Sequence, residues 1–582
     1  MAEKNKIGKE KAMKEKKWMA LVLAGAMAVS LLAGCGNSKG ETNGGTDVKE
    51  KKYVQSDVVS TMFGDVKGTM IEDTEIMAWY HIPYGAEPVG ELRWKAPSDP
   101  ENWGEVMDCT EIGEQALQGS GEEAVGTTDC LNLDVYAPTE NDGKLPVLVF
   151  FHGGNNQTGS TQGDLKGYAL AERNSCIVVN VNYRLGLLGF NCLPVLQTEE
   201  GTSGNYGFLD MARSLEWVRD NIESFGGDAN NVTISGHSAG GRDVMAMLIS
   251  PTFEGLFQKA IVSSGGMTVA DVELSQKKIA SFIAPLAVED GKAATEEDAA
   301  AWLLTTSEDV KEYLYSISEE RLMLAVGGAS IRMSAFPHLF ADGVTIPEEG
   351  FDTENYNDVP VLLTTGSDEF SMFNSGKVYE DGTIAEEELS AARAFGQKYG
   401  SEMYGYFNAI ESAQRMKKAG YDAPIYALKC DFGHDSSKMP GFALGAYHGI
   451  IISFLEPTSG LRSAFADSFG SEGGKQLTDM LNDYVKNFMD SKDGNPNGDN
   501  LTAWEQYDSA KEQYMVLDAT KDSATAQMED VLISSYQQVF EEMDADTTIS
   551  ESAKKAVIAH VMNGRWFSTE LDAHYGNADL WN

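Results

Sequence analysis

Positive charge is scarce in this sequence. Lysine and arginine number 45 against 89 aspartates and glutamates, which gives a formal net charge of −44. A surface this acidic repels phosphate, which argues against a nucleic-acid partner, and we interpret the charge as a source of solubility. Histidine is rare as well, with eight residues in a chain of 582, so any reaction that needs an imidazole has few candidates.

Cysteine is scarce, and the usual metal and nucleotide patterns are missing. Five cysteines remain if Cys35 is lipidated, and an odd number does not fit a disulfide framework. No C-x-x-C, H-E-x-x-H or Walker pattern occurs, so neither a metal nor another cofactor is indicated. The six cysteines are Cys35, Cys109, Cys130, Cys176, Cys192 and Cys430.

The first 52 residues differ from the rest. A lysine-rich start is followed by the apolar run WMALVLAGAMAVSLLAGC, which predicts a signal peptide over residues 1–34, with an uncleaved signal anchor as the alternative. The end of this run resembles a bacterial lipobox, which implies lipidation of Cys35 and a place on the cell surface. The polar, glycine-rich residues 35–52 are typical of a flexible tether.

The body of the chain alternates short β-branched runs with helical patterns. Residues 205–225 have the apolar spacing of an amphipathic helix, and residues 53–135 are typical of an antiparallel sheet edge. Buried strands that alternate with helices predict an α/β fold, with a mostly parallel sheet covered on both faces. The strands are predicted at 145–154, 175–184, 231–238, 259–266 and 359–369.

We predict one domain over residues 53–518, because no linker or repeat interrupts it. The remaining residues, 519–582, contain MEDVLISSYQQVFEEM and SESAKKAVIAHVMNG, whose patterns are helical. They are predicted to form an appended helical extension packed on the domain.

Ser238 stands in the pattern G-x-S-x-G at residues 236–240. It follows a predicted strand and precedes a predicted helix, as a nucleophile elbow requires, since flanking glycines permit the tight turn. The same pattern at residues 36–40 has neither neighbour and is discounted. Ser238 is therefore the candidate nucleophile.

A nucleophilic serine needs a base and an acid that orients it. His448, in a loop of small residues, and His434, among acidic and hydroxyl neighbours, are the candidate bases. Asp368 and Glu369 both follow a predicted strand, and nothing local chooses between them as the acid. The turn after residue 151 offers backbone amides for an oxyanion, at Gly153, Gly154 and Asn155, with Ala239 as a further donor.

Motifs spread over residues 60–515 resemble the type-B carboxylesterases and cholinesterase-like esterases. They include DCLNLDVYAP, FFHGGN, VNYRLGLLGF, EWVRDNIESFGGDANNVTISGHSAGG, GSDEF and GAYHG, in the family's order. The resemblance implies an α/β-hydrolase fold and a serine carboxylesterase that acts on small-molecule esters through an acyl-enzyme, without a cofactor. It assigns the catalytic roles to Ser238, Glu369 and His448, and the oxyanion roles to Gly154, Asn155 and Ala239.

Other functions with the same machinery stay open at this point. A catalytically silent binding or adhesion protein can share the fold, and a lipase, thioesterase or amidase can share the triad. The oligomeric state is not predicted.

Several positions depart from the family pattern. His237 replaces an acidic residue, and Asn155 replaces a small one. Thr128 replaces a glutamate, which puts a family salt bridge to Arg93 in doubt. Cys130 matches half of a family disulfide whose usual partner position holds Ala116, which leaves Cys109 as the alternative partner.

Two arginines near the expected site need partners. The resemblance implies a structural ion pair between Arg184 and Asp210. Arg242 lies in the first turn of the helix after Ser238, where a cation opposes the helix dipole. We expect Asp243, another acid or a substrate carboxylate to pair with it.

Overall fold

The computed structural model describes residues 53–141, 143–198, 201–327, 335–564 and 568–576. The predicted signal peptide, the tether and Cys35 all lie outside the described residues. No helix within those ranges is long and apolar enough to cross a membrane.

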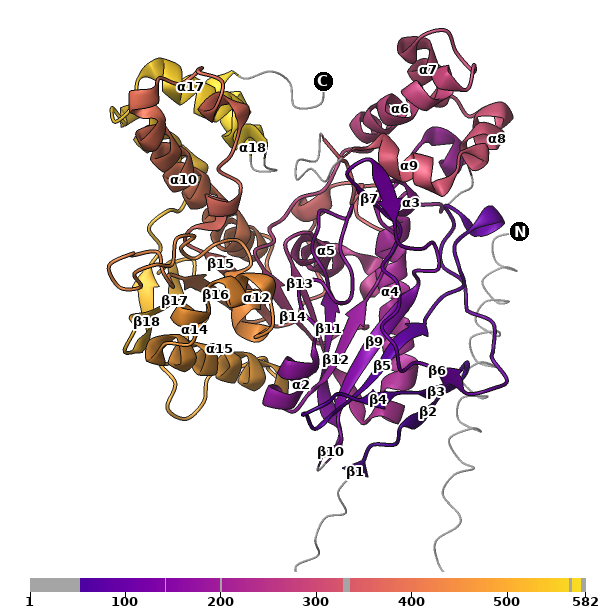
Figure 1. Ribbon diagram of the computed structural model, residues 1–582, viewed down its shortest axis with the longest axis horizontal. Helices are drawn as coiled ribbons and strands as arrows, with labels where there is room; N and C mark the ends of the chain where they lie inside the picture. The colour runs from indigo at the N-terminus through magenta and orange to yellow at the C-terminus, as the bar shows by residue number, and fades with distance from the viewer. Residues whose placement is uncertain (1–52, 142, 199–200, 328–334, 565–567, 577–582) are drawn as a thin grey trace, which may run out of the picture. The chain divides into compact units, whose positions relative to one another are not determined.

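Eleven strands of the described chain form one sheet, which carries the fold (Figure 1). The seven strands from β12 to β17 in the sheet order are mutually parallel, and antiparallel strands flank them at both ends. This arrangement confirms the predicted fold class and the antiparallel N-terminal edge. In sheet order the strands are β18 (Ala524–Asp530), β17 (Gln513–Ala519), β16 (Ile425–Cys430), β15 (Val361–Gly366), β14 (Lys259–Ser263), β13 (Gly227–His237), β11 (Leu145–Phe151), β12 (Ile177–Val181), β9 (Asn132–Pro138), β5 (Ile76–Pro83) and β4 (Thr69–Met70).

Alternate side chains of each central strand enter two separate apolar cores. In β11, Val147 and Val149 belong to one core, while Leu148 and Phe150 belong to the other. Successive side chains of a strand point to opposite faces, so both faces of the sheet are buried, as the continuous apolar sequence requires. The first core also contains residues of α4 (Tyr206–Asn221) and α5 (Ala239–Ile249), and the second contains residues of α2 (Tyr168–Asn174), α12 (Ile450–Leu455) and α15 (Glu472–Asp490).

Two further groups of helices lie beyond one end of the sheet (Figure 1). In the first group α9 packs against α3 and the small hairpin of β7 (Gln118–Ser120) and β8 (Glu123–Val125). In the second group α10 packs against α16 and α17. The helices concerned are α3 (Gly186–Gly189), α6 (Val272–Glu289), α7 (Glu296–Leu303), α8 (Glu308–Ser316), α9 (Glu319–Ala325), α10 (Leu389–Gly405), α16 (Tyr536–Ala545), α17 (Glu551–His560) and α18 (Ser568–Tyr575).

The predicted boundary at residue 518 is wrong. The sheet continues through β17 into the antiparallel strand β18, so residues 519–530 belong to the domain and not to a helical extension. In β18 the alternate residues Ala524, Ala526 and Met528 pack against a core, and only the last three residues of this strand fall within the segment MEDVLISSYQQVFEEM that was predicted to be helical. The helices predicted beyond it are confirmed as α16 and α17.

The ion pair between Arg184 and Asp210 joins the segment after β12 to α4. Two guanidinium nitrogens donate to the two carboxylate oxygens at 2.8 and 2.7 Å, and the backbone amide of Arg184 donates to the same carboxylate at 3.1 Å. The Asp210 side chain is fully buried and that of Arg184 is 3% exposed. Loss of one partner therefore leaves a buried charge without compensation.

We predict that Asp210→Ala lowers the free energy of unfolding by about 3–5 kcal/mol. The exposed pair of Arg219 and Asp220 supplies the control, since Asp220→Ala is expected to cost less than about 1 kcal/mol. Urea unfolding followed by tryptophan fluorescence measures both values. Equal losses in the two variants would contradict a special role for the buried pair.

Candidate active site

Ser238 occupies a sharp turn between β13 and α5. Its backbone has φ +55° and ψ −114°, a left-handed conformation that side chains other than glycine rarely adopt. A Cβ atom at Gly236 would lie 2.2 Å from the carbonyl oxygen of Gly240, and one at Gly240 would lie 2.0 Å from that of Phe151. Both glycines are therefore required by close packing, as the elbow interpretation predicted.

The side chains of Glu369 and His448 are in hydrogen-bond contact. Glu369 follows β15, and its Oε2 lies 2.6 Å from Nδ1 of His448. The other carboxylate oxygen accepts hydrogen bonds from the Gly366 amide at 2.7 Å and the Ser264 hydroxyl at 2.6 Å. Burial opposes ionisation of Glu369, but His448 and these donors outweigh it and lower the pKa of the carboxyl group. The carboxylate is thus held ionised and aimed at the ring.

The two residues that competed for these roles pair with each other instead. Nδ1 of His434 lies 3.0 Å from Oδ2 of Asp368, and the His434 side chain is 54% exposed. The same carboxylate accepts the backbone amide of Ala446 at 2.9 Å, two residues before His448. This pair therefore holds the loop that carries His448, while the residues implied by the family resemblance are the ones brought together.

The loop after β11 presents backbone amides beside Ser238. The amide of Gly153 donates to Asp164 at 2.7 Å, so Gly153 is not available to an oxyanion. In the described part of the chain the amides of Gly154, Asn155 and Ala239 donate to no other group. These three are the amides that the resemblance implied for an oxyanion.

Ser238 and His448 line the same cavity, which has a volume of about 600 Å³. Gly154 and Asn155 also line it, together with the apolar side chains of Phe373 and other residues. A serine, an imidazole, free amides and an apolar wall in one cavity can bind and attack a carbonyl compound. The remaining apolar lining residues are Met372, Ile452 and Leu461.

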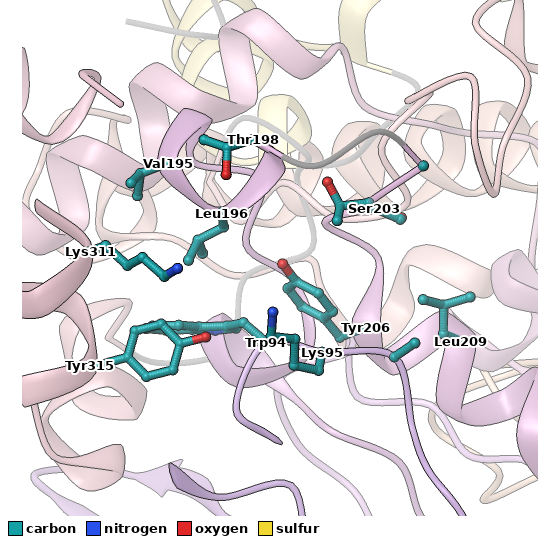
Figure 2. A pocket seen from close by; sticks show the side chains of 13 residues that line it. Trp94, Lys95, Val195, Leu196, Thr198, Ser203, Tyr206, Leu209, Lys311 and Tyr315 are labelled. Carbon is teal, nitrogen blue, oxygen red and sulfur yellow. The ribbon is translucent and has the colours of Figure 1, made fainter. Parts of the chain in front are cut away.

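A second cavity of about 240 Å³ contains none of these groups. Figure 2 shows its aromatic lining residues, Trp94, Tyr206 and Tyr315, with the ends of Lys95 and Lys311 directed toward the same space. None of the predicted catalytic residues lines it.

Sequence reasoning missed Asp164, which pairs with His237. The carboxylate lies 3.1 Å from Nδ1 of His237 and also accepts the Gly153 amide. Burial would lower the pKa of His237, but Asp164 and, to a smaller extent, Glu369 outweigh it and raise that pKa. The ring centroids of His237 and His448 are 4.9 Å apart. No local pattern around Asp164 could have identified it, because the contact spans 73 residues.

The other departures from the family pattern also find partners. Thr128 donates to Glu87 at 2.8 Å, and Arg93 pairs with Glu319 instead. Cys109 and Cys130 are both buried free thiols, so the alternative disulfide is not formed. Burial raises the pKa of the Cys109 thiol to about 12, which leaves it unreactive. In the described ranges no cluster of three or more potential metal ligands occurs.

A model of the Carboxylesterase family matches residues 55–402 and 382–533. The chain belongs to this family. It is 30% identical to the para-nitrobenzyl esterase of Bacillus subtilis (strain 168) over 497 residues, covering 79% of this chain and 95% of that protein. It is 26% identical to liver carboxylesterase 1 of Oryctolagus cuniculus over 530 residues, covering 80% and 90%.

Solved structures of carboxylesterases agree with the fold. The carboxylesterase EST55 of Geobacillus stearothermophilus matches with a TM-score of 0.63 at 25% identity, over 83% of this chain and all of that one. A PNB esterase structure matches with a TM-score of 0.62 at 29% identity, over 83% of this chain and 99% of that one. The fold is that of the α/β-hydrolases, and the protein is a carboxylic ester hydrolase of the Carboxylesterase family.

The pair of His237 and Asp164 makes a testable contribution to stability. Asp164 has a lowered pKa, so its contribution is present above its unfolded pKa of about 4 and is lost at lower pH. His237 has a raised pKa, so its contribution is complete below its unfolded pKa of about 6.5 and is lost as pH rises through the folded value. The pair therefore stabilises the fold most at about pH 5–6.

We predict that His237→Gln lowers the free energy of unfolding by about 1 kcal/mol at pH 5.5 and by less at pH 9. His560→Gln, at an exposed histidine of α17, is the matched control and should change the free energy of unfolding by less than about 0.5 kcal/mol. Urea titrations at several pH values measure the difference. A loss for His237→Gln that does not vary with pH would rule out the ion pair as its source.

Proposed function

We propose that this carboxylesterase hydrolyses small-molecule esters through an acyl-enzyme on Ser238, with His448 as the base and Glu369 as its orienting acid. The observation that carries the proposal is the buried 2.6 Å contact between Glu369 and His448, whose ring lines the same cavity as Ser238. A carboxylate at Nδ1 fixes the tautomer in which Nε2 accepts a proton, as a base for serine requires.

The first half-reaction transfers the acyl group. Oγ of Ser238 attacks the carbonyl carbon while its proton passes to Nε2 of His448. The carbonyl oxygen becomes negative and is received by the amides of Gly154, Asn155 and Ala239. Collapse of this intermediate breaks the bond to the alcohol oxygen, which takes the proton from His448 and leaves.

The second half-reaction returns the enzyme to its starting state. Water gives a proton to His448 and attacks the acyl carbon, and the new tetrahedral intermediate again places its negative oxygen among the three amides. Collapse breaks the bond to Oγ of Ser238, which recovers its proton from His448 and releases the acid. Each amide of such a hole typically contributes about 3–4 kcal/mol to transition-state stabilisation.

The apolar side of the cavity favours a neutral acyl or alcohol group. Phe373 lines the cavity and meets the His448 ring edge-on, with 5.1 Å between the ring centroids. An aromatic side chain in this position offers an apolar surface to a hydrophobic substrate group and shields the imidazole from water. The name of the Bacillus relative, a para-nitrobenzyl esterase, makes esters of benzylic alcohols a sensible first substrate class.

We also propose that the mature enzyme is held at a bacterial cell surface by a lipid on Cys35. The proposal is supported by the basic and apolar regions of residues 1–34 and by the sequence Leu32 to Cys35. Mass spectrometry of the mature N-terminus in a bacterial host tests it. The mature chain is expected to begin at Cys35 and to carry a lipid on it. A chain without a lipid on Cys35, whether or not residues 1–34 have been removed, would refute the anchor.

We predict that residues 53–582 with wild-type sequence are labelled by a fluorophosphonate probe and show a burst of p-nitrophenol from p-nitrophenyl butyrate. Ser238→Ala should abolish both, because the acyl group has no other acceptor. Ser459→Ala, which removes another hydroxyl group that lines the cavity, is the control and should retain labelling. A folded wild type that neither labels nor turns over would favour a catalytically silent binding protein.

We predict further that Glu369→Gln lowers kcat by about 10³–10⁴-fold, since an amide at this position no longer fixes the tautomer or stabilises the imidazolium. Asp368→Asn, one residue away, keeps an acceptor for the Ala446 amide and should change kcat by less than about threefold. Steady-state kinetics on p-nitrophenyl butyrate separates the two. A larger loss in Asp368→Asn would reverse the assignment of the acid.

A further inference from the structure

Two pairs of polar residues that are 87 positions apart meet beside Ser238. Arg242 donates from Nη2 to Oδ1 of Asn155 at 2.7 Å. Asp243 accepts at Oδ1 from Nδ2 of Asn156 at 2.8 Å. These contacts join consecutive residues of α5 to consecutive residues of the loop after β11. The loop of residues 153–158 is called the oxyanion loop below.

Among the described residues, Arg242 donates a hydrogen bond to the carboxamide of Asn155, and Asp243 adds an electrostatic attraction. The side chain of Arg242 is fully buried, so it does not meet a substrate carboxylate in the cavity.

Burial of Arg242 and Asp243 has an energetic cost for folding. Burial lowers the pKa of Arg242 to about 10 and raises the pKa of Asp243 to about 7, which means that burial disfavours the charged form of both groups. Apolar residues in the same volume often stabilise a fold as well or better. Two ionisable side chains that are buried beside a nucleophile are thus better explained by the geometry that they impose.

The oxyanion loop needs such constraints. Asn155 and Asn156 both have φ +56°, the left-handed region that asparagine enters more readily than most residues but still at a cost. The hydroxyl of Tyr183 donates to Oδ1 of Asn156 at 3.1 Å, so that side chain is held from two sides. Because these torsions are unfavourable, the amides of the loop keep a constant direction only as long as its side chains are held in place.

The proposed oxyanion hole is divided between two elements. Gly154 and Asn155 supply amides from the loop, and Ala239 supplies one from the first residue of α5. Arg242 stands three residues further along the same helix. A hydrogen bond from Arg242 to Asn155 therefore links the two halves through one rigid helix.

We propose that Arg242 and Asp243 are positioning residues that align the amides of the oxyanion loop with the amide of Ala239. This inference rests on the function proposed for Ser238. It assigns a role to the polar residues at positions 155, 156, 242 and 243, and it treats them as one coupled unit. The two halves of the hole lose their alignment when either side of a contact is removed.

Paired substitutions test the coupling. Arg242→Met removes the donor while keeping a long unbranched side chain, and Asn155→Ala removes its acceptor. Each is expected to lower kcat on p-nitrophenyl butyrate by about 10- to 100-fold with KM within about threefold, because misaligned amides fail chiefly in the transition state. The double variant should be no worse than the more damaged single variant.

Conservative variants supply the rescue. Asp243→Asn keeps an oxygen that accepts from Asn156 and should retain activity within about threefold, whereas Asp243→Leu lacks an acceptor and should match Arg242→Met. Arg242→Lys keeps a donor and should recover part of the loss. Arg219→Met, at an exposed arginine of α4, is the control and should leave kcat unchanged.

A transition-state analogue separates alignment from general loss of structure. A trifluoromethyl ketone places a negative oxygen in the hole when Ser238 adds to it, so its inhibition constant should rise in parallel with the loss of kcat/KM. Active-site titration gives the concentration of competent enzyme in each variant, and the urea midpoint shows whether the variant is folded under the assay conditions.

An inhibition constant unchanged in Arg242→Met, or losses that multiply in the double variant, would overturn the positioning role while the wild type remains an active esterase. A wild type that neither labels nor turns over would overturn the proposed function and this inference with it. Parallel losses with a non-additive double variant support the inference.

Discussion

The left-handed backbone of Ser238 is the constraint on which the rest of the site depends. It is tolerated because glycines at 236 and 240 let β11 and α5 approach the turn within distances that no Cβ atom allows. The same close approach brings the loop after β11 beside the serine hydroxyl. The strain at one residue and the position of the neighbouring loop are therefore two results of one packing arrangement, and neither can change without the other.

The parallel sheet explains why distant residues converge on this point. The strands β11, β13 and β15 run in the same direction, so the loop after β11, Ser238 and Glu369 emerge at one edge. His448 comes from a loop and not from a strand, and it depends on the hydrogen bond between Asp368 and the Ala446 amide for its place. The adjacent carboxylates thus have different roles, since Glu369 contacts the His448 ring and Asp368 accepts the Ala446 amide of the loop that carries His448.

The sequence predicted the central strands, the elbow and the family-assigned residues, because each depends on local pattern or on motifs with a fixed order. It did not predict β18, whose alternating residues pack only once β17 lies beside them. It also missed Asp164, because the contact with His237 spans 73 residues and leaves no local trace. The Cys109 and Cys130 alternative could not be decided from spacing, since a disulfide requires a geometry that spacing does not specify.

The C-terminal strands have a consequence for the order in which the chain acquires its structure. One face of β11 and β13 is covered by α15, and the sheet is completed by β17 and β18, so residues beyond 470 bury surfaces formed by residues near 150 and 230. Such pairings between remote segments are slow to form. A partly synthesised chain that ends before α15 therefore exposes the apolar face of its central strands and is expected to need a chaperone to stay in solution.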